Sequence, residues 1–274
     1  MVTTEGSLVF YLECQLELKS YGVQLGRHFF RGQRMPKITT LQQVKEKKDA
    51  FIKQIFSTVS PYIDPLDTAF SFGLCHMWRR RLVSSIGEGE KVLDLCTGTG
   101  ELALRIAKRV GRRGSVVGVD FCDDMLTRAR KKMNPGLGNI EFILADAKDL
   151  AFPDNSFDAV TIAFGIRNVP DTAAVLKVIH RVLRPGGRFF CLELTIPRNR
   201  LVLPIYKFYT FRVMPSVAKI VTRSSLPYTY LPRSIETFHP PMEFKNIMEE
   251  CGFTGVKVRS MSLGVATIYE AVKV

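Results

Sequence analysis

Short apolar runs alternate with longer amphipathic stretches over the second two thirds of the chain. The runs cover residues 91–96, 115–120, 140–146, 157–164 and 187–194, and β-branched or aromatic residues are frequent in them. Most of the stretches between them repeat apolar residues at the three- and four-residue spacing of a helix. Strands that alternate with helices in this way predict an α/β fold with a parallel sheet and crossover helices.

The segments on either side of this alternation differ from it. Apolar residues between Leu41 and Phe56 predict one helix before the first strand, and a second helix is predicted over about residues 68–86. The motif RPGG at residues 184–187 predicts a turn before the fifth strand. Residues 196–241, rich in Tyr, Phe, Pro and Arg, then interrupt the pattern as an inserted, partly helical lid. A helix over 242–251 and strands over 255–263 and 265–274 follow, and the last two strands are close enough to pair antiparallel.

This pattern predicts three parts: an N-terminal extension over residues 1–40, a helical cap over 41–89, and a catalytic domain over 90–274 that contains the lid. The extension joins an apolar stretch with two glutamates to a basic, loop-like stretch. A targeting peptide, a disordered arm and a true start at Met35 are the alternatives for it.

Charge and cysteine content narrow the environment in which the chain works. Lys and Arg exceed Asp and Glu by 39 − 26 = 13, so the surface should attract anions such as nucleic acid, anionic lipid or a phosphorylated substrate. The six cysteines form no CxxC pair, which favours reduced thiols in the cytoplasm and predicts neither a disulfide framework nor a zinc site. An organelle stays open as an alternative. No apolar run reaches the roughly 20 residues that span a bilayer.

A glycine-rich turn follows the first predicted strand, in DLCTGTGEL at residues 94–102. Gly98 and Gly100 allow a ligand to approach the backbone, and the free amides of the helix that starts there can hold a polar or anionic group. The second strand ends in Asp120, at the distance where a carboxylate can take both hydroxyls of a ribose. The third glycine of a dinucleotide motif is absent, which argues against NAD. A tight turn without a ligand is the alternative.

The third strand adds two residues to the same edge of the sheet. It ends near Asp146 and Ala147, so these should lie with Asp94, Gly98 and Asp120 at the carboxyl edge where open α/β sheets bind ligands. Several carboxylates there describe an adenosine pocket, with Asp120 for the ribose and Asp146 for the adenine amino group.

Two sets of motifs together resemble a known family. VLDLCTGTGEL and GVDFCDDML are similar to motifs of the class I S-adenosylmethionine-dependent methyltransferases. AFPDNSFDAVTIAFGIRNV, RVLRPGGRFFCLELTIP and YTYLPRSI resemble the ubiquinone/menaquinone biosynthesis C-methyltransferase family, over about residue 51 to the C-terminus. The resemblance implies a Rossmann-like fold with a seven-stranded, mostly parallel sheet whose last strand is antiparallel, N-terminal helices and the inserted lid.

The resemblance also implies a site, a cofactor and a substrate class. S-adenosylmethionine would be bound by Asp94, Thr97, Gly98, Thr99, Gly100, Asp120, Phe121, Asp146, Ala147 and Ala163, and Arg167 with Asn168 would act on the quinol. The activity implied is C-methylation of a prenylated quinol of the demethylmenaquinol or 2-methoxy-6-polyprenyl-benzoquinol type. The chain departs from the family in the cap, where Ile63, Asp67 and Cys75 replace Tyr, Asn and His, which leaves the substrate open.

The chemistry of a quinol suggests why an arginine and an asparagine follow the fourth strand. A quinol ring becomes nucleophilic when a hydroxyl loses its proton, and a fixed positive group stabilises the resulting oxyanion. Arg167 stays charged at any working pH, so it suits that role, with Asn168 and a water, better than the role of a base. Alternatively, Arg167 pairs with a structural carboxylate and Asn168 caps a turn.

Other functions and partners stay open from the sequence alone. A methyltransferase of the same fold could act on another small phenol, a sterol or a lipid, and a non-enzymatic adenosine-binding subunit is a further alternative. We expect no nucleic-acid partner, because no recognised nucleic-acid-reading motif accompanies the charge. The lid alternates apolar residues with Lys207, Arg212, Lys219 and Arg223, so it could contact a membrane surface, such as the inner membrane, or pack only on the core. A homodimer also stays open.

Overall fold

The computed structural model describes residues 41–134, 136–222 and 226–274. The chain forms two compact units, Met1–Gln54 and Ile55–Val274, and the boundary between them lies inside helix α2 (Leu41–Val59). The predicted N-terminal extension, residues 1–40, lies outside the described residues.

The region predicted as one helix over residues 68–86 contains parts of two helices. Helix α3 (Ile63–Phe70) ends before Phe72 and Gly73, whose backbones are both left-handed with φ of 51° and 76°, and α4 (Leu74–Val83) begins directly after them. A glycine adopts this conformation without strain, so the chain turns here instead of continuing the helix. The prediction of a single helix was therefore wrong at Gly73.

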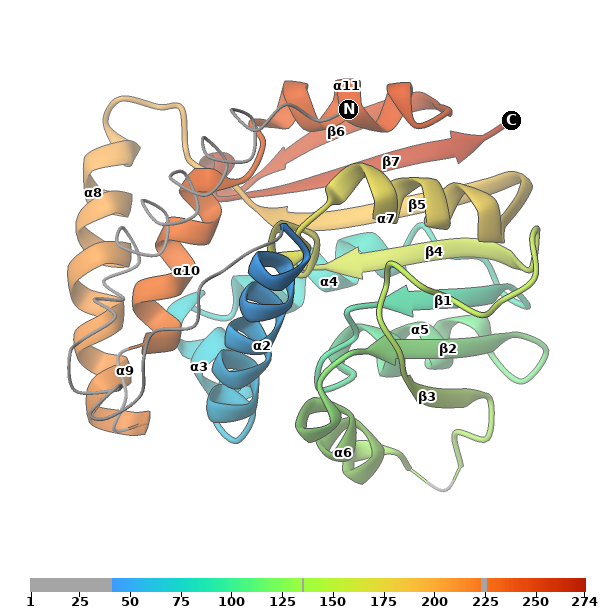
Figure 1. The fold of residues 1–274 in the computed structure, drawn as a ribbon, viewed down its shortest axis with the longest axis horizontal. Helices are drawn as coiled ribbons and strands as arrows, with labels where there is room; N and C mark the ends of the chain where they lie inside the picture. Colours follow the sequence, from blue (N-terminus) through green and yellow to red (C-terminus); the bar gives the residue numbers. More distant parts are fainter. Residues whose placement is uncertain (1–40, 135, 223–225) are drawn as a thin grey trace. The chain divides into compact units, whose positions relative to one another are not determined.

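A seven-stranded sheet in the order β3-β2-β1-β4-β5-β7-β6 forms the centre of the unit (Figure 1). The strands are β1 (Lys91–Leu95), β2 (Ser115–Asp120), β3 (Ile140–Leu144), β4 (Phe157–Ala163), β5 (Leu183–Leu194), β6 (Phe253–Met261) and β7 (Ala266–Lys273). Strands β1 to β5 pair in parallel, and β7 pairs antiparallel with both β5 and β6. The predicted sheet is confirmed.

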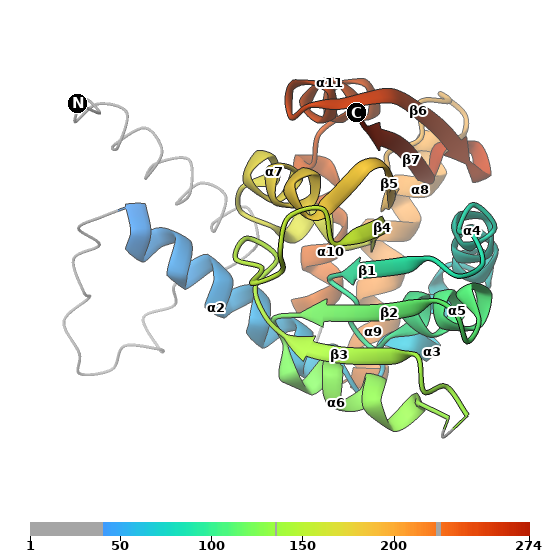
Figure 2. The ribbon, with the colours of Figure 1, turned by 90° about the vertical axis from the view of Figure 1, so that its right-hand side faces the viewer.

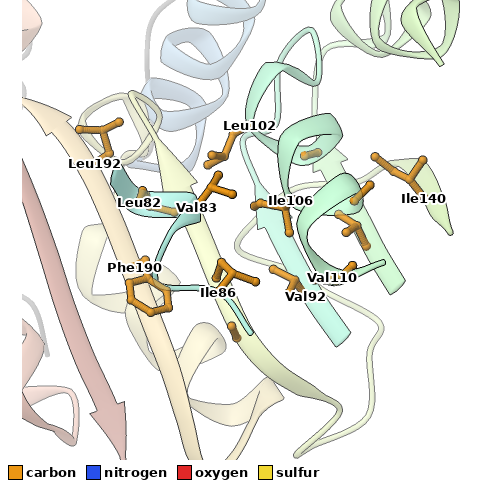
Figure 3. Close-up of a cluster of buried hydrophobic side chains, with 14 of the residues drawn as sticks. Leu82, Val83, Ile86, Val92, Leu102, Ile106, Val110, Ile140, Phe190 and Leu192 are labelled. Atoms are coloured by element: carbon orange, nitrogen blue, oxygen red, sulfur yellow. The ribbon is translucent and has the colours of Figure 1, made fainter. Parts of the chain in front are cut away.

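Helices cover both faces of the sheet because alternate residues of the central strands point to opposite sides (Figure 2). Val92 of β1 packs in a cluster with α4 and α5 (Glu101–Val110), and Figure 3 shows it beside Ile106 and Val110. Leu93 and Leu95 pack in a second cluster with α7 (Thr172–Val182) and α11 (Pro241–Glu250). Helix α6 (Asp123–Lys132) connects β2 to β3. Asp94, Asp120 and Glu193 are buried near the carboxyl ends of β1, β2 and β5.

The RPGG motif does not precede β5, as predicted, but lies inside it. Leu183 pairs with Phe157, and the pairing with β4 resumes at Arg188, opposite Ala159. The residues between them bulge out of the ladder, and Gly186 has a φ of 76°. The motif therefore makes a bulge rather than the end of a connection.

The inserted lid consists of helices that follow one another after β5. They are α8 (Val202–Phe208), a π-helical turn over Tyr209–Val213, α9 (Met214–Thr222) and α10 (Leu226–Thr237). Met214 and Ala218 pack in a third cluster with Tyr228, Leu66 of α3 and Met125 of α6. The predicted helical lid is confirmed.

Candidate functional site

The turn between β1 and α5 has open space in front of its backbone. Gly98 and Gly100 have φ of 56° and 77°, a left-handed conformation that favours glycine. A Cβ on Gly98 would meet no atom within 4 Å, whereas a Cβ on Gly100 would lie 2.8 Å from Cζ of Phe142. The backbone at Gly98 is thus open to a ligand, and Gly100 is needed for packing, so the turn fits the nucleoside cofactor that the motifs imply.

Asp120, at the end of β2, is buried beside this turn. Its Oδ2 accepts the backbone N–H of Gly98 at 2.8 Å, and its Oδ1 accepts that of Cys122 at 2.9 Å. Burial raises the pKa of the carboxyl, and these hydrogen bonds oppose the rise. Each carboxylate oxygen can accept more than one hydrogen bond, so Asp120 still has acceptor capacity for hydroxyl groups.

Asp94 lies inside the protein, behind the same turn. Its two oxygens accept the hydroxyls of Thr97 and Thr161, each at 2.6 Å, and the residue is 1% exposed. Burial raises the pKa of Asp94 to about 6, although both hydrogen bonds favour the charged form. Asp94 therefore joins the turn to β4, with a carboxyl that titrates near neutral pH.

Thr99 connects the turn to the cap. Its hydroxyl donates to Oδ1 of Asp64 on α3 at 2.6 Å, and Asp64 forms an ion pair with Lys132 of α6. Lys132 also contacts Glu101 at 2.9 Å. The cap motif that contains Ile63 and Asp67 also contains Asp64, whereas no sequence motif indicated Lys132. Hydrogen bonds and ion pairs thus join the cap to the turn between β1 and α5.

The other predicted cofactor residues follow β2, β3 and β4. Phe121 is half-buried, with its ring edge-on to Phe56 at 6.4 Å. Asp146 is exposed and accepts the backbone N–H of Lys148 at 2.9 Å, and Ala147 next to it is buried. Ala163 is the half-buried last residue of β4. All lie at or after the carboxyl ends of the parallel strands, where the sequence predicted them.

Arg167 lies in a short 3-10 turn, Ile166–Asn168, directly after β4. Its Nη1 donates to Oε1 of Glu193 at 2.5 Å and to the carbonyl of Phe164 at 2.7 Å. Its backbone N–H donates to Oε2 of Glu193 at 3.3 Å, and its Nε donates to the hydroxyl of Ser234 at 3.3 Å. The guanidinium is 7% exposed and Glu193 is fully buried. Arg167 thus has the structural carboxylate partner that the alternative interpretation of the sequence predicted.

The same contacts leave one nitrogen of the guanidinium available. Nη2 of Arg167 makes no hydrogen bond with any residue that the structure describes. Tyr206 of α8 is close enough for the charge of Arg167 to act on it, and burial raises the pKa of this phenol to about 12. A neutral phenol and a guanidinium N–H are both hydrogen-bond donors, which suits an anionic oxygen.

Asn168 is held from the lid. Its Oδ1 accepts the hydroxyl of Tyr230 at 3.0 Å, and its Nδ2 donates to the carbonyl of Phe164 at 3.4 Å. Tyr230 lies four residues before Ser234 on α10, so both residues lie on one side of that helix. Two hydrogen bonds therefore join the Arg167–Asn168 turn to α10, within the YTYLPRSI motif.

The three altered cap positions differ in how they relate to this turn. Cys75 is 3% exposed in the hydrophobic core, and Ile63 packs on the cluster under the lid. Asp67 instead forms an ion pair with Arg79 at 3.3 Å, and the charge of Arg167 also acts on it. Asp67 is thus the altered position that changes the charge near Arg167.

Two thiols lie close to the site, those of the half-buried Cys96 and the buried Cys191. Cys96 belongs to the turn after β1, and Cys191 lies on β5 two residues before Glu193. Burial raises the pKa of both thiols well above the usual value, and the nearby carboxylates add to the rise.

Comparison with known proteins places these features in a family. The sequence profile of the ubiE/COQ5 methyltransferase family matches residues 41–273. The chain is 41% identical to the ubiquinone/menaquinone biosynthesis C-methyltransferase UbiE of Geobacter sulfurreducens, over 85% of this chain and 92% of the relative. It is 38% identical to the UbiE of Rickettsia bellii, over 83% of this chain and 94% of that relative.

Solved structures support the fold at lower identity. A SAM-dependent methyltransferase from Aquifex aeolicus superposes with a TM-score of 0.52 at 21% identity, over 72% of this chain and 89% of that one. A SAM-dependent methyltransferase from Thermotoga maritima gives 0.56 at 16% identity, over 80% and 100% of the two chains. These findings confirm the class I methyltransferase fold, and the family match confirms the S-adenosylmethionine-dependent enzyme class that the motifs implied. The chain belongs to the ubiE/COQ5 methyltransferase family.

Proposed function

We propose that this enzyme transfers a methyl group to a ring carbon of a prenylated quinol, of the demethylmenaquinol or 2-methoxy-6-polyprenyl-benzoquinol type. The UbiE proteins to which it is similar are named for ubiquinone/menaquinone biosynthesis and for C-methylation. The observation that carries the proposal is the Arg167–Asn168 turn, which is fixed by hydrogen bonds to Glu193 of β5 and to α10 of the lid.

The cofactor would be held at the carboxyl edge of the sheet. The residues proposed to contact it are Asp94, Thr97, Gly98, Thr99, Gly100, Asp120, Phe121, Asp146, Ala147 and Ala163. S-adenosylmethionine, when bound, supplies an electrophilic methyl group on a sulfonium. The open backbone at Gly98 and the acceptor capacity of Asp120 support this placement. No metal or covalent nucleophile is required for such a transfer.

Arg167 would stabilise the phenolate form of the quinol. A hydroxyl placed at Nη2 would pass its proton to a water molecule more readily, because the guanidinium charge favours the oxyanion that remains. Glu193 supports this role by fixing the guanidinium, and its negative charge offsets the desolvation cost of burying Arg167. The ring carbon next to the oxyanion then becomes nucleophilic. Holding it in line with the methyl group can contribute ~7–11 kcal/mol through proximity.

A different phenol is the second candidate substrate, and Asp67 is the observation that favours it. The family motif has asparagine at this position, whereas this chain has Asp67. Its carboxylate pairs with Arg79 and lies within reach of the charge of Arg167. A second negative charge beside a phenolate weakens its stabilisation, so a substrate with a hydrogen-bond donor at this position would suit the site better.

Quinone extracts from cells that lack this protein test the proposal. Mass spectrometry should show a precursor lighter by one methyl group, and purified enzyme with methyl-labelled S-adenosylmethionine should return the label to a ring carbon of that precursor. An unchanged quinone profile, together with label transfer to a sterol or a non-prenylated phenol, would reject the quinol in favour of the second candidate.

A further inference from the structure

The lid presents an apolar surface to solvent that its packing does not explain. We define the outer face of the lid as Leu201, Ile205, Phe208, Val217, Ile220 and Val221, which belong to or directly precede α8 and α9. Leu201, Ile205 and Ile220 are 80%, 71% and 81% exposed. Figure 1 shows α8 and α9 following each other along the side of the lid that faces away from the sheet. Isolated exposed apolar residues are common, but six on one helical segment mark a contact surface.

The opposite side of the same segment already packs against the protein. Thr210, Met214 and Ala218 are buried, and the last two contact the cluster under the lid. A helix that only covered a core would have polar residues on its other side. The segment is therefore apolar both inward and outward, and the outward side requires a partner.

Charge indicates which partner fits. Residues 198–222 contain five basic residues, Arg198, Arg200, Lys207, Arg212 and Lys219, and no aspartate or glutamate. Lys207 pairs with Glu236, whereas Arg212 and Lys219 are exposed and form no ion pair with a described residue. In a symmetric dimer the same face would meet itself and bring these positive charges together. An anionic surface instead complements them.

We infer that the outer face of the lid docks on an anionic lipid bilayer. Leu201, Ile205, Phe208 and Ile220 enter the boundary between headgroups and acyl chains, and Arg212 and Lys219 contact the headgroups. No helix among the described residues is long and apolar enough to cross a membrane, so the contact is a docking on one side only. This inference goes beyond the proposed function, because it depends on the surface of the lid and not on the identity of the substrate.

Vesicle binding without substrate tests the inference. Full-length protein is sedimented with two kinds of vesicle. One contains phosphatidylcholine alone, and the other also contains roughly 30% phosphatidylglycerol, which gives it an anionic surface. We expect strong binding to the anionic vesicles only. Arg212→Gln with Lys219→Gln should weaken it by on the order of tenfold or more, since each basic residue near such a surface contributes roughly fivefold. Ile205→Asn with Ile220→Asn should weaken it by at least about tenfold.

Two matched double variants control for the loss of apolar surface and of charge. Leu263→Asn with Val274→Asn removes side chains that are 74% and 82% exposed, and Arg112→Gln with Lys131→Gln removes two exposed charges away from the lid. Both should bind like the wild type, and circular dichroism checks that every variant is folded.

Equal binding to neutral vesicles, equal loss in the controls, or no binding at all would overturn the inference. A dimer in solution that the lid variants dissociate would assign the face to a second copy. Methyl transfer to a soluble quinol analogue is measured separately, so a failure of docking is distinct from a failure of the proposed function.

Discussion

Arg167 and Glu193 are joined twice: the Oε1 of the buried carboxylate lies 2.5 Å from Nη1, and its Oε2 accepts the backbone N–H of the same arginine at 3.3 Å. The carboxylate therefore fixes both the chain and the head group of Arg167. A guanidinium held at both ends is already oriented before a ligand arrives, which is the arrangement that electrostatic stabilisation of an oxyanion requires.

Arg167→Lys should separate this electrostatic role from folding. Lysine keeps a positive charge beside Glu193. It loses the Nε that donates to Ser234, and it loses the available donor Nη2. We expect kcat to fall on the order of a hundredfold, with the dissociation constant for S-adenosylmethionine within about twofold of the wild type. Arg167→Ala should lose turnover as well, and it should also lose ~3–5 kcal/mol of unfolding free energy, because Glu193 is left unpaired.

The matched control for this pair is Arg184→Lys, which changes an exposed arginine that contacts Asp158 at 2.7 Å. Turnover should be unaffected there, since an exposed ion pair contributes little. Calorimetry for the cofactor and initial rates for turnover measure the two quantities. Full activity in Arg167→Lys would show that the charge is sufficient without the guanidinium geometry, and full activity in Arg167→Ala would remove Arg167 from the mechanism.

Tyr230→Phe tests the connection between the lid and the turn. The change removes only the hydroxyl that Asn168 accepts at 3.0 Å, and it should lower the unfolding free energy by about 1 kcal/mol. If α10 positions Asn168 for the reaction, kcat should fall by at least about fivefold while cofactor affinity is retained. Tyr228→Phe, also buried on α10, is the control in steady-state kinetics. Equal effects of the two changes would indicate a purely structural role for Tyr230.

Gly98→Ala and Gly100→Ala should affect different properties. Both residues are left-handed, so each alanine should lower the unfolding free energy by about 1–2 kcal/mol. Gly100→Ala also brings Cβ within 2.8 Å of Phe142 and should lose about 1–3 kcal/mol more. Gly98→Ala meets no protein atom, so its further effect should be on cofactor affinity, lowered by at least about tenfold. Chemical denaturation and calorimetry distinguish the two, and unchanged affinity in Gly98→Ala would place the cofactor elsewhere.

Asp94 should make stability depend on pH. Its pKa is about 6 in the folded protein against 3.8 ordinarily, so the folded state holds the proton more tightly. The group therefore stabilises the fold below pH about 4, and this contribution is lost as the pH rises through 6; the full difference is about 3 kcal/mol. Asp94→Asn cannot titrate. Its stability relative to the wild type should rise between pH 4 and 7, as measured by denaturant unfolding, and a constant difference would contradict the raised pKa.

The sequence was sufficient for the sheet and for the positions of the candidate residues, for a physical reason. Apolar period and strand length determine where parallel strands form, and their carboxyl ends necessarily meet at one edge, so Asp94, Asp120 and Asp146 were placed together without a structure. The break at Gly73 was missed because a single glycine is compatible with a helix, and only the left-handed backbone of Phe72 and Gly73 shows the turn.

The partners of the site residues were harder to predict because they come from distant segments. Glu193 did leave a signal, since an acidic residue inside the apolar strand FFCLEL must find a buried partner. The pattern did not identify that partner as Arg167. Asp64, Lys132, Tyr230 and Ser234 depend on how the cap and lid helices pack on the sheet, which is a matter of tertiary contact and not of local sequence.

The raised pKa values of Cys96 and Cys191 bear on how such an enzyme would survive its own chemistry. Oxidised quinones are electrophiles that add to thiolates, and a thiolate beside the ring would be consumed by alkylation. Burial and the surrounding carboxylates raise the pKa of both thiols and so disfavour the reactive thiolate form. A quinone formed by later oxidation of the proposed product would therefore meet two neutral thiols beside the acidic strand ends, and not two thiolates.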